Sequence, residues 1–279
     1  MLGIGLALAA SLCWGFGDFI GGSKSRVLPV LVVLICSQLI GLVWIGGVAL
    51  IAEEPVPETH EIVLAALSAV AGTAGLVCFF RAIAIGKMSL VVPIAATAAV
   101  VPVIVGIASG DRPSALQLLG MVVALAGAVM ASREPGEEGE RGSLAAGVLL
   151  AALSALFIGF FFLAIDGASD GGAVWASLVN RITSVTLLLV AVAAMRPKLS
   201  PARPHAAALA LAGTLDVSAN LLFAAASTEG LISLVSVAGS LYPVITVLLA
   251  RLVLKERVHR IQEAGVVAAL GGVVLIAAG

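Results

Sequence analysis

The sequence predicts an all-α polytopic membrane protein with ten transmembrane helices, arranged as two inverted repeats of five helices. Hydrophobic residues make up 61% of the 279 residues and charged residues only 11%, a far more apolar balance than a soluble domain has. The apolar residues form ten stretches of about 20 residues, the length at which a helix crosses a hydrocarbon core of roughly 30 Å. The second five stretches also restate the first five.

Each stretch is expected to be a helix, because a backbone in lipid must satisfy its own polar groups and these runs are too long for barrel strands. The first stretch lacks the basic flank of a signal peptide, so we expect it to remain as the first helix. The predicted spans are 2–22, 28–52, 62–85, 89–109, 114–131, 143–165, 172–195, 205–228, 231–253 and 260–278.

The chain divides at a polar link, 133–142 (REPGEEGERG), into a first repeat over 1–132 and a second repeat over 143–279. The segment that begins at Ala71 aligns without gaps with the segment from Ala212, at an offset of 141 residues. After a four-residue shift, the segment from Asp111 aligns with the segment from Glu256. The matched positions predict an internal duplication; they pair Pro102 with Pro243, Arg112 with Arg257, Gln117 with Gln262 and Gly120 with Gly265.

Five spans in each repeat is an odd number, so the second repeat must enter the membrane from the opposite side. Inverted repeats of this kind build many secondary transporters, in which two faces open alternately around a central site. The sequence contains no GxxxxGK[ST] motif for ATP, so we expect transport to be driven by gradients or by another subunit.

The last predicted helix of each repeat begins with a similar charged element, Gly-Asp-Arg-Pro at 110–113 and Lys-Glu-Arg at 255–257, followed by the same Gln-then-Gly spacing. With the duplicated ten-span layout, these elements resemble the EamA-type transporters of the drug/metabolite transporter superfamily. Asp111 stands where the family's repeat usually has Glu, and the 143–165 span matches its counterpart weakly. The resemblance implies secondary transport of small metabolites, commonly export, through a cavity lined by the first, third, fourth, sixth, eighth and ninth helices.

The distribution of Lys and Arg predicts the orientation, since these residues concentrate on the cytoplasmic side. Alternate links, beginning with the one that holds Lys24 and Arg26, carry twelve Lys and Arg residues, whereas the opposite links carry only Arg112. We therefore predict a multi-pass protein of the cell (inner) membrane with both termini outside and the 133–142 link in the cytoplasm.

Among the charged residues inside predicted spans, where a charge usually faces a bundle interior, a partner or water, four stand out. Arg181 and Asp216 lie near mid-depth, with Asn180 and Asn220 beside them; Asp18 and Arg81 lie near the cytoplasmic ends of their helices. Two alternatives remain open for Asp18 and Arg81, which either pair with each other or extend to the membrane interface by snorkelling. It also remains open whether Arg181 and Asp216 form a purely structural ion pair. Burial favours a protonated carboxylate and a nearby guanidinium favours the ionised form, so Asp216 or Asp18 is a candidate for coupling proton entry to substrate exit.

Other polar positions complete the candidate cavity. Pro102 and Pro243 are candidate hinges, because proline removes a backbone hydrogen bond within a helix. Ser236 and Ser240, with adjacent Tyr242, give the ninth helix a polar stripe that either lines the cavity or joins helices. Trp14, one turn before Asp18, is expected to stack on a substrate rather than pack against lipid.

The predicted function is a secondary active transporter, expected to export a small amphipathic metabolite, with the lipid bilayer as its environment and the proton as a candidate coupling ion. No catalytic residue, cofactor or metal site is predicted, since the three His and three Cys show no ligand spacing. The net charge of −1 argues against nucleic acid. The alternatives are a channel or receptor-like membrane protein, which currents would identify, and an intramembrane enzyme, which would need a grouping such as HExxH, and no such motif occurs.

Overall fold

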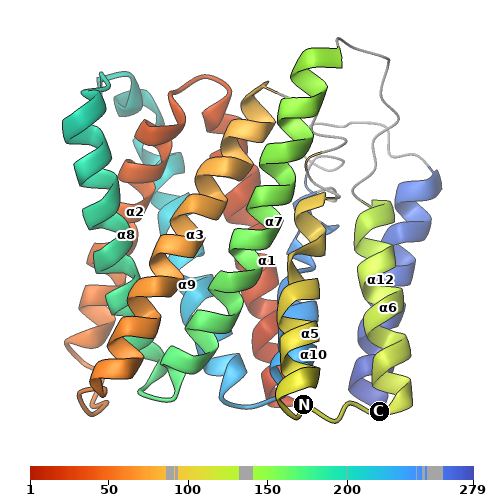
Figure 1. Cartoon of the computed structure of the whole chain (residues 1–279). Helices are drawn as coiled ribbons and strands as arrows, with labels where there is room; N and C mark the ends of the chain where they lie inside the picture. The colour runs from red at the N-terminus through yellow and green to blue at the C-terminus, as the bar shows by residue number, and fades with distance from the viewer. Residues whose placement is uncertain are drawn as a thin grey trace.

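The computed structural model describes residues 1–85, 94–131, 141–198, 200–242, 244–246 and 260–279, with the single positions 91 and 249. These ranges are helical, with no strand among them (Figure 1). Pro243, most of the 133–142 link and the 255–257 element lie outside the described residues. The helices are α1 (Leu2–Ser25), α2 (Val30–Ala49), α3 (Thr59–Ile85), η1 (Ala96–Ala99), α5 (Val100–Ser109), α6 (Ala115–Ala131), α7 (Arg141–Ser169), α8 (Ala173–Met195), η2 (Ser200–His205), α9 (Ala206–Ser227), α10 (Ile232–Gly239) and α12 (Arg260–Ala278).

Most of these helices agree with the predicted spans to within a few residues, the usual uncertainty of helix ends. Six of them are long and apolar enough to cross a membrane, and four further apolar helices are shorter, at 10–17 residues. The shorter ones coincide with the fourth, fifth, ninth and tenth predicted spans. The all-helical membrane fold is thus confirmed, whereas ten complete crossings remain a prediction.

The helices pack mainly across the two halves of the chain. The most extensive contacts join α6 with α12, α3 with α7, and α1 with α9. When α1 to α6 are matched in order with α7 to α12, α1 corresponds to α7 and α3 corresponds to α9. The α1–α9 pair therefore corresponds to the α7–α3 pair. The α6–α12 pair joins two helices that correspond to each other. In Figure 1 the counterparts α1 and α7 run in opposite directions, and the two termini lie at the same end of the bundle. This is the packing expected of two related halves with opposite orientation.

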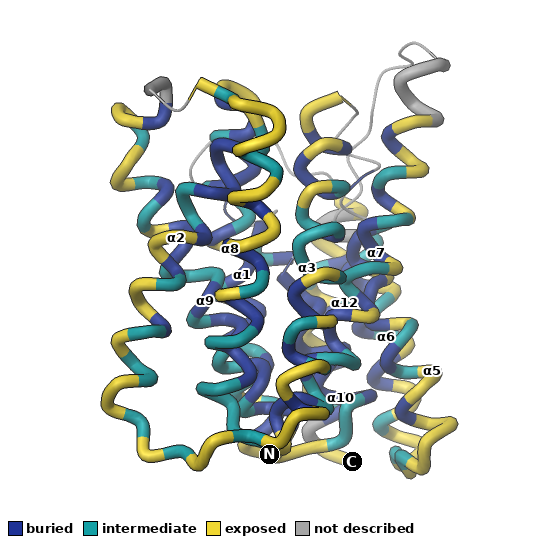
Figure 2. The backbone as a smooth tube through the Cα atoms, turned by 60° about the vertical axis from the view of Figure 1, so that its left-hand side comes forward, coloured by how far each residue is buried: buried dark blue, intermediate teal, exposed yellow. Residues whose placement is uncertain are grey.

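Small residues allow this close packing. A Cβ placed on Gly127 of α6 would lie 2.2 Å from the backbone nitrogen of Ala269 in α12, and one on Gly272 would lie 2.4 Å from that of Ala124. Backbones that approach this closely are typical of helix pairs in membranes. Exposed residues lie on the outer faces of the helices (Figure 2), and many of them are large and apolar, among them Val43, which is 76% exposed. Such a surface suits lipid rather than water.

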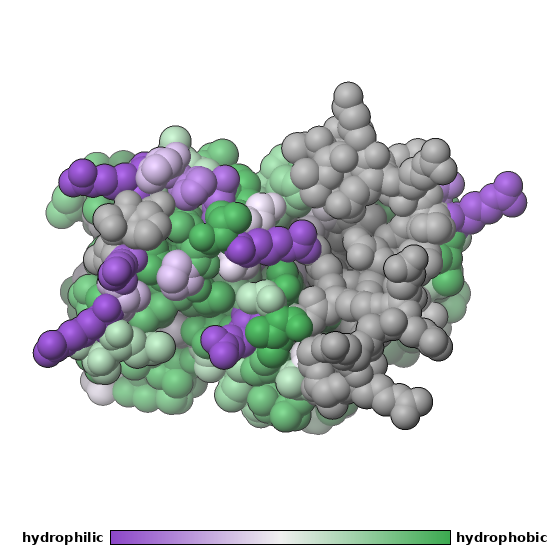
Figure 3. Space-filling view, turned by 90° about the horizontal axis from the view of Figure 1, so that it is seen from above, coloured by the Kyte–Doolittle hydropathy of each residue, from purple (hydrophilic) through white to green (hydrophobic). Residues whose placement is uncertain are grey.

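Hydrogen bonds between side chains and the backbone cap the starts of α6 and α10. Ser114 and Gln117 form a reciprocal capping box at the start of α6: the Ser114 N–H donates to Gln117 Oε1 at 2.8 Å, and the Gln117 N–H donates to Ser114 Oγ at 3.1 Å. Asp111, just before it, accepts the backbone N–H of Ser233 in the first turn of α10 at 3.0 Å. The charged element at 110–113 therefore joins the fourth and ninth predicted spans. Seen from the end opposite the termini, the described part shows separate hydrophilic side chains scattered among hydrophobic ones (Figure 3).

Candidate functional site

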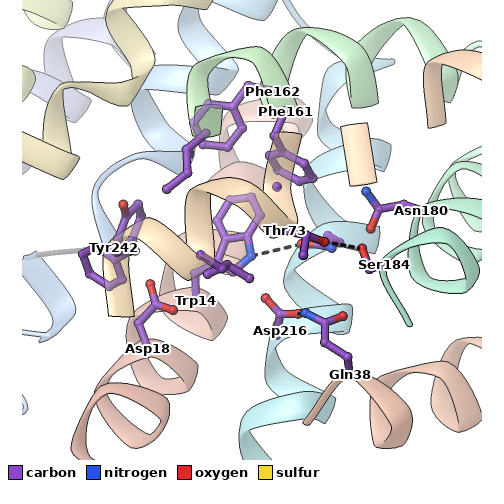
Figure 4. Close-up of a pocket in the computed structure, with 15 residues that line it drawn as sticks. Trp14, Asp18, Gln38, Thr73, Phe161, Phe162, Asn180, Ser184, Asp216 and Tyr242 are labelled. Carbon is purple, nitrogen blue, oxygen red and sulfur yellow. Dashed lines mark hydrogen bonds between the residues drawn. The ribbon is translucent and has the colours of Figure 1, made fainter. Parts of the chain in front are cut away.

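A cavity of about 60 Å³ lies between the two halves of the chain, near the middle of the helices (Figure 4). Helices α1, α2 and α3 of the first half and α7, α8 and α9 of the second half supply its walls, together with Tyr242. Its lining consists of Trp14, Asp18, Gln38, Gly72, Thr73, Leu76, Phe79, Ile158, Phe161, Phe162, Asn180, Ser184, Asp216, Asn220 and Tyr242.

Asp216 and Arg181 form an ion pair beside the cavity. Arg181 NH1 donates to Asp216 Oδ2 at 2.8 Å, and the same NH1 contacts Gln38 Oε1, whose amide nitrogen in turn donates to Asp216 at 3.4 Å. The Arg181 side chain is 1% exposed, and its other guanidinium nitrogens, Nε and NH2, have no hydrogen-bond partner. Gly41 makes room for the group, because a Cβ there would lie 3.3 Å from Arg181 Cζ. The guanidinium is therefore sealed behind the lining, and its charge is balanced by Asp216.

Asp18 is the second carboxylate of the cavity, and among the described residues it differs from Asp216 in having no ion-pair partner. The expected pairing of Asp18 with Arg81 does not form, since neither of these described residues takes part in an ion pair. Arg81 is exposed on α3, as its snorkelling alternative predicts for a long side chain near a helix end. Figure 4 shows Asp18 beside Tyr242 on one side of the cavity, with Asp216 and Gln38 on the other. The hydroxyl of Tyr242 has no hydrogen-bond partner.

One wall of the cavity is aromatic. The ring centroid of Trp14 lies 6.1 Å from that of Phe161, 5.7 Å from Phe162 and 5.6 Å from Phe223, and Phe162 stacks on Phe223 at 4.6 Å. The indole N–H donates to Asn220 Oδ1 at 3.1 Å. Trp14 is thus turned into the bundle and not toward lipid. Since it lines the cavity, it presents an aromatic surface to any molecule held there.

Two further hydrogen bonds join the halves across the cavity. Asn180 Nδ2 donates to Ser68 Oγ at 2.8 Å, and the hydroxyls of Thr73 and Ser184 lie 3.1 Å apart. The first repeat contributes Ser68 and Thr73 on α3, and the second contributes Asn180 and Ser184 on α8. These bonds fix the amide and hydroxyl groups that any ligand meets.

The structure therefore brings together six of the predicted site residues in the cavity lining, namely Trp14, Asp18, Asn180, Asp216, Asn220 and Tyr242, with Arg181 directly behind. Ser236 and Ser240 are completely buried in helix contacts and are not part of that lining. The lining also contains residues that the sequence reasoning did not select: Gln38, Thr73, Phe161, Phe162 and Ser184. Gln38 had a usable signal, since it is an amide in a strongly apolar span, whereas nothing in the sequence distinguishes these two phenylalanines from others.

The helices beside the cavity are broken at matching positions of the two repeats. The 3₁₀ segment η1 (Ala96–Ala99) precedes α5, and Pro102 lies buried in the first turn of α5. A proline clashes with the carbonyl four residues earlier, which is that of Ala98, within η1. At the offset of 141 residues, Ala98 corresponds to Gly239, where α10 ends and a turn follows. Pro102 thus lies beside a break in the helix, and its role as a hinge stays a prediction.

Among the described residues, no group of three or more His, Cys, Asp or Glu could hold a metal ion. A second cavity of about 20 Å³ shares Asp18, Gln38, Leu76 and Asp216 with the first. It continues toward Gly21 and Phe80, where the ring of Phe80 lies 2.8 Å from the place a Gly21 Cβ would take. The lining of the two cavities thus leads from the carboxylates toward the C-terminal end of α1.

A model of the EamA-like transporter family matches residues 1–133 and again residues 145–278. None of the curated proteins matches the sequence. Among solved structures 26 chains match; one, described as "Crystal structure of protein", is 14% identical and has a TM-score of 0.78, covering 99% of this chain and 98% of its own. At that identity the likeness shows the fold alone.

Proposed function

Because the chain belongs to the EamA-like transporter family, whose members are membrane transporters, we propose that it is a secondary active transporter that moves a small amphipathic metabolite by alternating access. The observation that carries this proposal is the cavity between the two halves, whose lining combines charged, amide and aromatic side chains from both. A volume of about 60 Å³ holds a few water molecules. A metabolite therefore requires the halves to separate on one side.

The proposed motion uses the symmetry of the packing. Counterpart pairs such as α1–α9 and α7–α3 allow the same rearrangement to open either end, as in other carriers built from inverted repeats. The breaks before α5 and after α10 are the proposed bending points, with Pro102 at one of them. In this proposal the halves rock about the cavity, which faces one compartment at a time.

We propose Asp18 as the group that couples transport to a proton gradient. Its carboxylate has neither an ion pair nor a hydrogen bond in the described structure, whereas Asp216 is held by Arg181 and Gln38. Among the described residues, the ionisable groups that interact with it are Asp216 and Tyr242. In proteoliposomes, we expect Asp18→Asn to remove the dependence of flux on a pH gradient and Asp216→Asn to reduce flux through misfolding. If both variants keep the full gradient dependence, proton coupling at these carboxylates is wrong.

Export follows from the proposed orientation. The helix ends that carry Lys24, Arg26, Arg196 and Lys198 lie together, opposite the two termini (Figure 1), which supports a cytoplasmic position for them. The second cavity leads from Asp18 toward this end. Substrate would then enter from the cytoplasm past Phe80.

Cysteine accessibility tests alternating access directly. With Cys13, Cys36 and Cys78 replaced by alanine, a Thr73→Cys variant in membrane vesicles is treated with a membrane-impermeant thiol reagent from either side. A carrier exposes this position to each side in turn, so we expect reaction from both sides without ion currents. Reaction from one side only under every condition, or steady single-channel currents, would contradict the proposal.

The orientation needs a separate test at the bundle ends. Leu50, at the end of α2, is 88% exposed, and Lys198, after α8, is also exposed. In the same cysteine-free background, we expect Leu50→Cys to react from outside whole cells and Lys198→Cys to react only after the cells are opened. Reaction of both on the same surface would refute the inverted topology.

A further inference from the structure

We infer that the cavity selects a small organic cation, such as a protonated amine with an apolar body. This inference rests on the proposed function, because it names the substrate class of the same transporter site. Three features of the described residues lead to it: the charge balance of the cavity, the acceptors it leaves free, and the aromatic wall beside them.

The charge balance is negative. Two carboxylates, Asp18 and Asp216, line the cavity, and the guanidinium within 4 Å of either is that of Arg181, which pairs with Asp216 at 2.8 Å. Arg181 is itself absent from the lining and 1% exposed. Its charge is therefore neutralised by Asp216 and is not accessible to a ligand. Asp18 is left as one uncompensated carboxylate in a membrane interior, where an ionised group needs a partner.

The free hydrogen-bonding groups of the cavity suit a ligand that donates hydrogen bonds rather than one that accepts them. An ammonium group carries three donors and no acceptor. The hydroxyl oxygen of Tyr242 has no hydrogen-bond partner, Asp18 takes part in no ion pair among the described residues, and Figure 4 shows the two side chains next to each other. The amide oxygen of Asn220 and the amide nitrogen of Asn180 are already bonded to Trp14 and Ser68. An ammonium placed between Asp18 and Tyr242 would therefore find acceptors that no protein group uses.

The aromatic wall stands where the rest of such a ligand would lie. Trp14 and Asp18 are four residues apart on α1, so they share a face of that helix. The indole is surrounded by Phe161 and Phe162, which also line the cavity. Aromatic faces attract cations, Trp most strongly, and the same rings pack against apolar groups. An anionic ligand would meet Asp18 without access to the sealed Arg181, so the arrangement disfavours it.

Three probes of similar shape test the charge preference: 2-phenylethylammonium, 2-phenylethanol and 3-phenylpropionate. Binding of each to the purified protein in detergent is measured by isothermal titration calorimetry and by the shift in melting temperature. For the wild-type protein, we expect the ammonium to bind at least tenfold more tightly than the alcohol, and the carboxylate to bind most weakly. If the alcohol or the carboxylate binds as tightly as the ammonium, or if none of the three binds, the inference is overturned.

Variants assign the preference to Asp18. We expect the Asp18→Asn protein to bind the ammonium no more tightly than the alcohol, which is at least a tenfold loss of affinity for the ammonium. The control variant Asp170→Asn, which removes an exposed carboxylate outside this cavity, should keep the wild-type order of affinities for the three probes. An Asp18→Asn protein that melts normally and still prefers the ammonium tenfold would exclude Asp18 as the recognition group. The accessibility experiment on Thr73→Cys uses no ligand, so alternating access can stand even when the cation preference fails.

Discussion

Replacing Arg181 with Met should destabilise the protein strongly. The substitution keeps most of the side-chain volume but leaves the Asp216 carboxylate without its cation, and it removes the NH1 contact with Gln38. Breaking a buried ion pair by removing one partner typically costs about 3–5 kcal/mol. Asp216 is 20% exposed and keeps the Gln38 amide as a donor, so we expect the lower end of that range, about 3 kcal/mol.

Thermal unfolding of the purified protein in detergent measures this cost. For a chain of this size, roughly 2–4 °C of melting temperature correspond to each kcal/mol, so Arg181→Met should melt about 6–12 °C below the wild-type protein. The matched control is Arg81→Met, which removes an exposed arginine from another membrane helix. We expect it to change stability by no more than about 0.5 kcal/mol.

The double variant Arg181→Met/Asp216→Asn separates an ion pair from a general packing effect. Because the second substitution removes the unpaired carboxylate, the double variant should be more stable than the sum of the two single losses predicts, by about 2 kcal/mol. If the losses add without this coupling, or if Arg181→Met melts like Arg81→Met, then Arg181 and Asp216 do not stabilise the bundle as a pair.

Three further substitutions test the packing, the charged link and the hinge. Gly127→Ala should lower the free energy of unfolding by about 1–3 kcal/mol, because the added methyl group forces α6 and α12 apart. The control variant Gly46→Ala, whose Cβ meets nothing within 4 Å, should melt at or above the wild-type temperature. Equal melting temperatures of the two variants would contradict the close approach of α6 and α12. Asp111→Ala should cost about 1 kcal/mol by removing the acceptor for the Ser233 N–H, and an unchanged melting temperature would show that this cap contributes nothing. Pro102→Ala should preserve melting and lower the rate of labelling at the cavity from one side, and unchanged labelling would argue against a hinge there.

Charge inside apolar spans led from the sequence to residues that the structure places at the cavity, whereas the pairing of those charges did not follow from the sequence. Asp18, Arg181 and Asp216 were selected because an ionised group in lipid requires a function or a partner, and all three lie at or directly behind the cavity. The pairing of Asp18 with Arg81, which the sequence left open, is not among the ion pairs of the described residues, since residues at similar depth on neighbouring helices can still face different directions. The absence of Ser236 and Ser240 from the cavity lining was likewise not foreseeable, because a serine on a helix bonds equally well within its own helix, as Ser240 does with the Val237 carbonyl.

The sequence by itself determined that this is a helical membrane protein made of two repeats, because apolar length and duplicated Pro, Gln and Gly positions are local properties of the chain. It also determined the depth of each charge. Only the tertiary structure decided which helices meet across the two halves, that Arg181 pairs with Asp216, and that Asp18 has no ion-pair partner among the described residues. Those outcomes depend on the rotation of each helix about its axis, which is set by contacts such as those at Gly41 and Gly213 between distant segments.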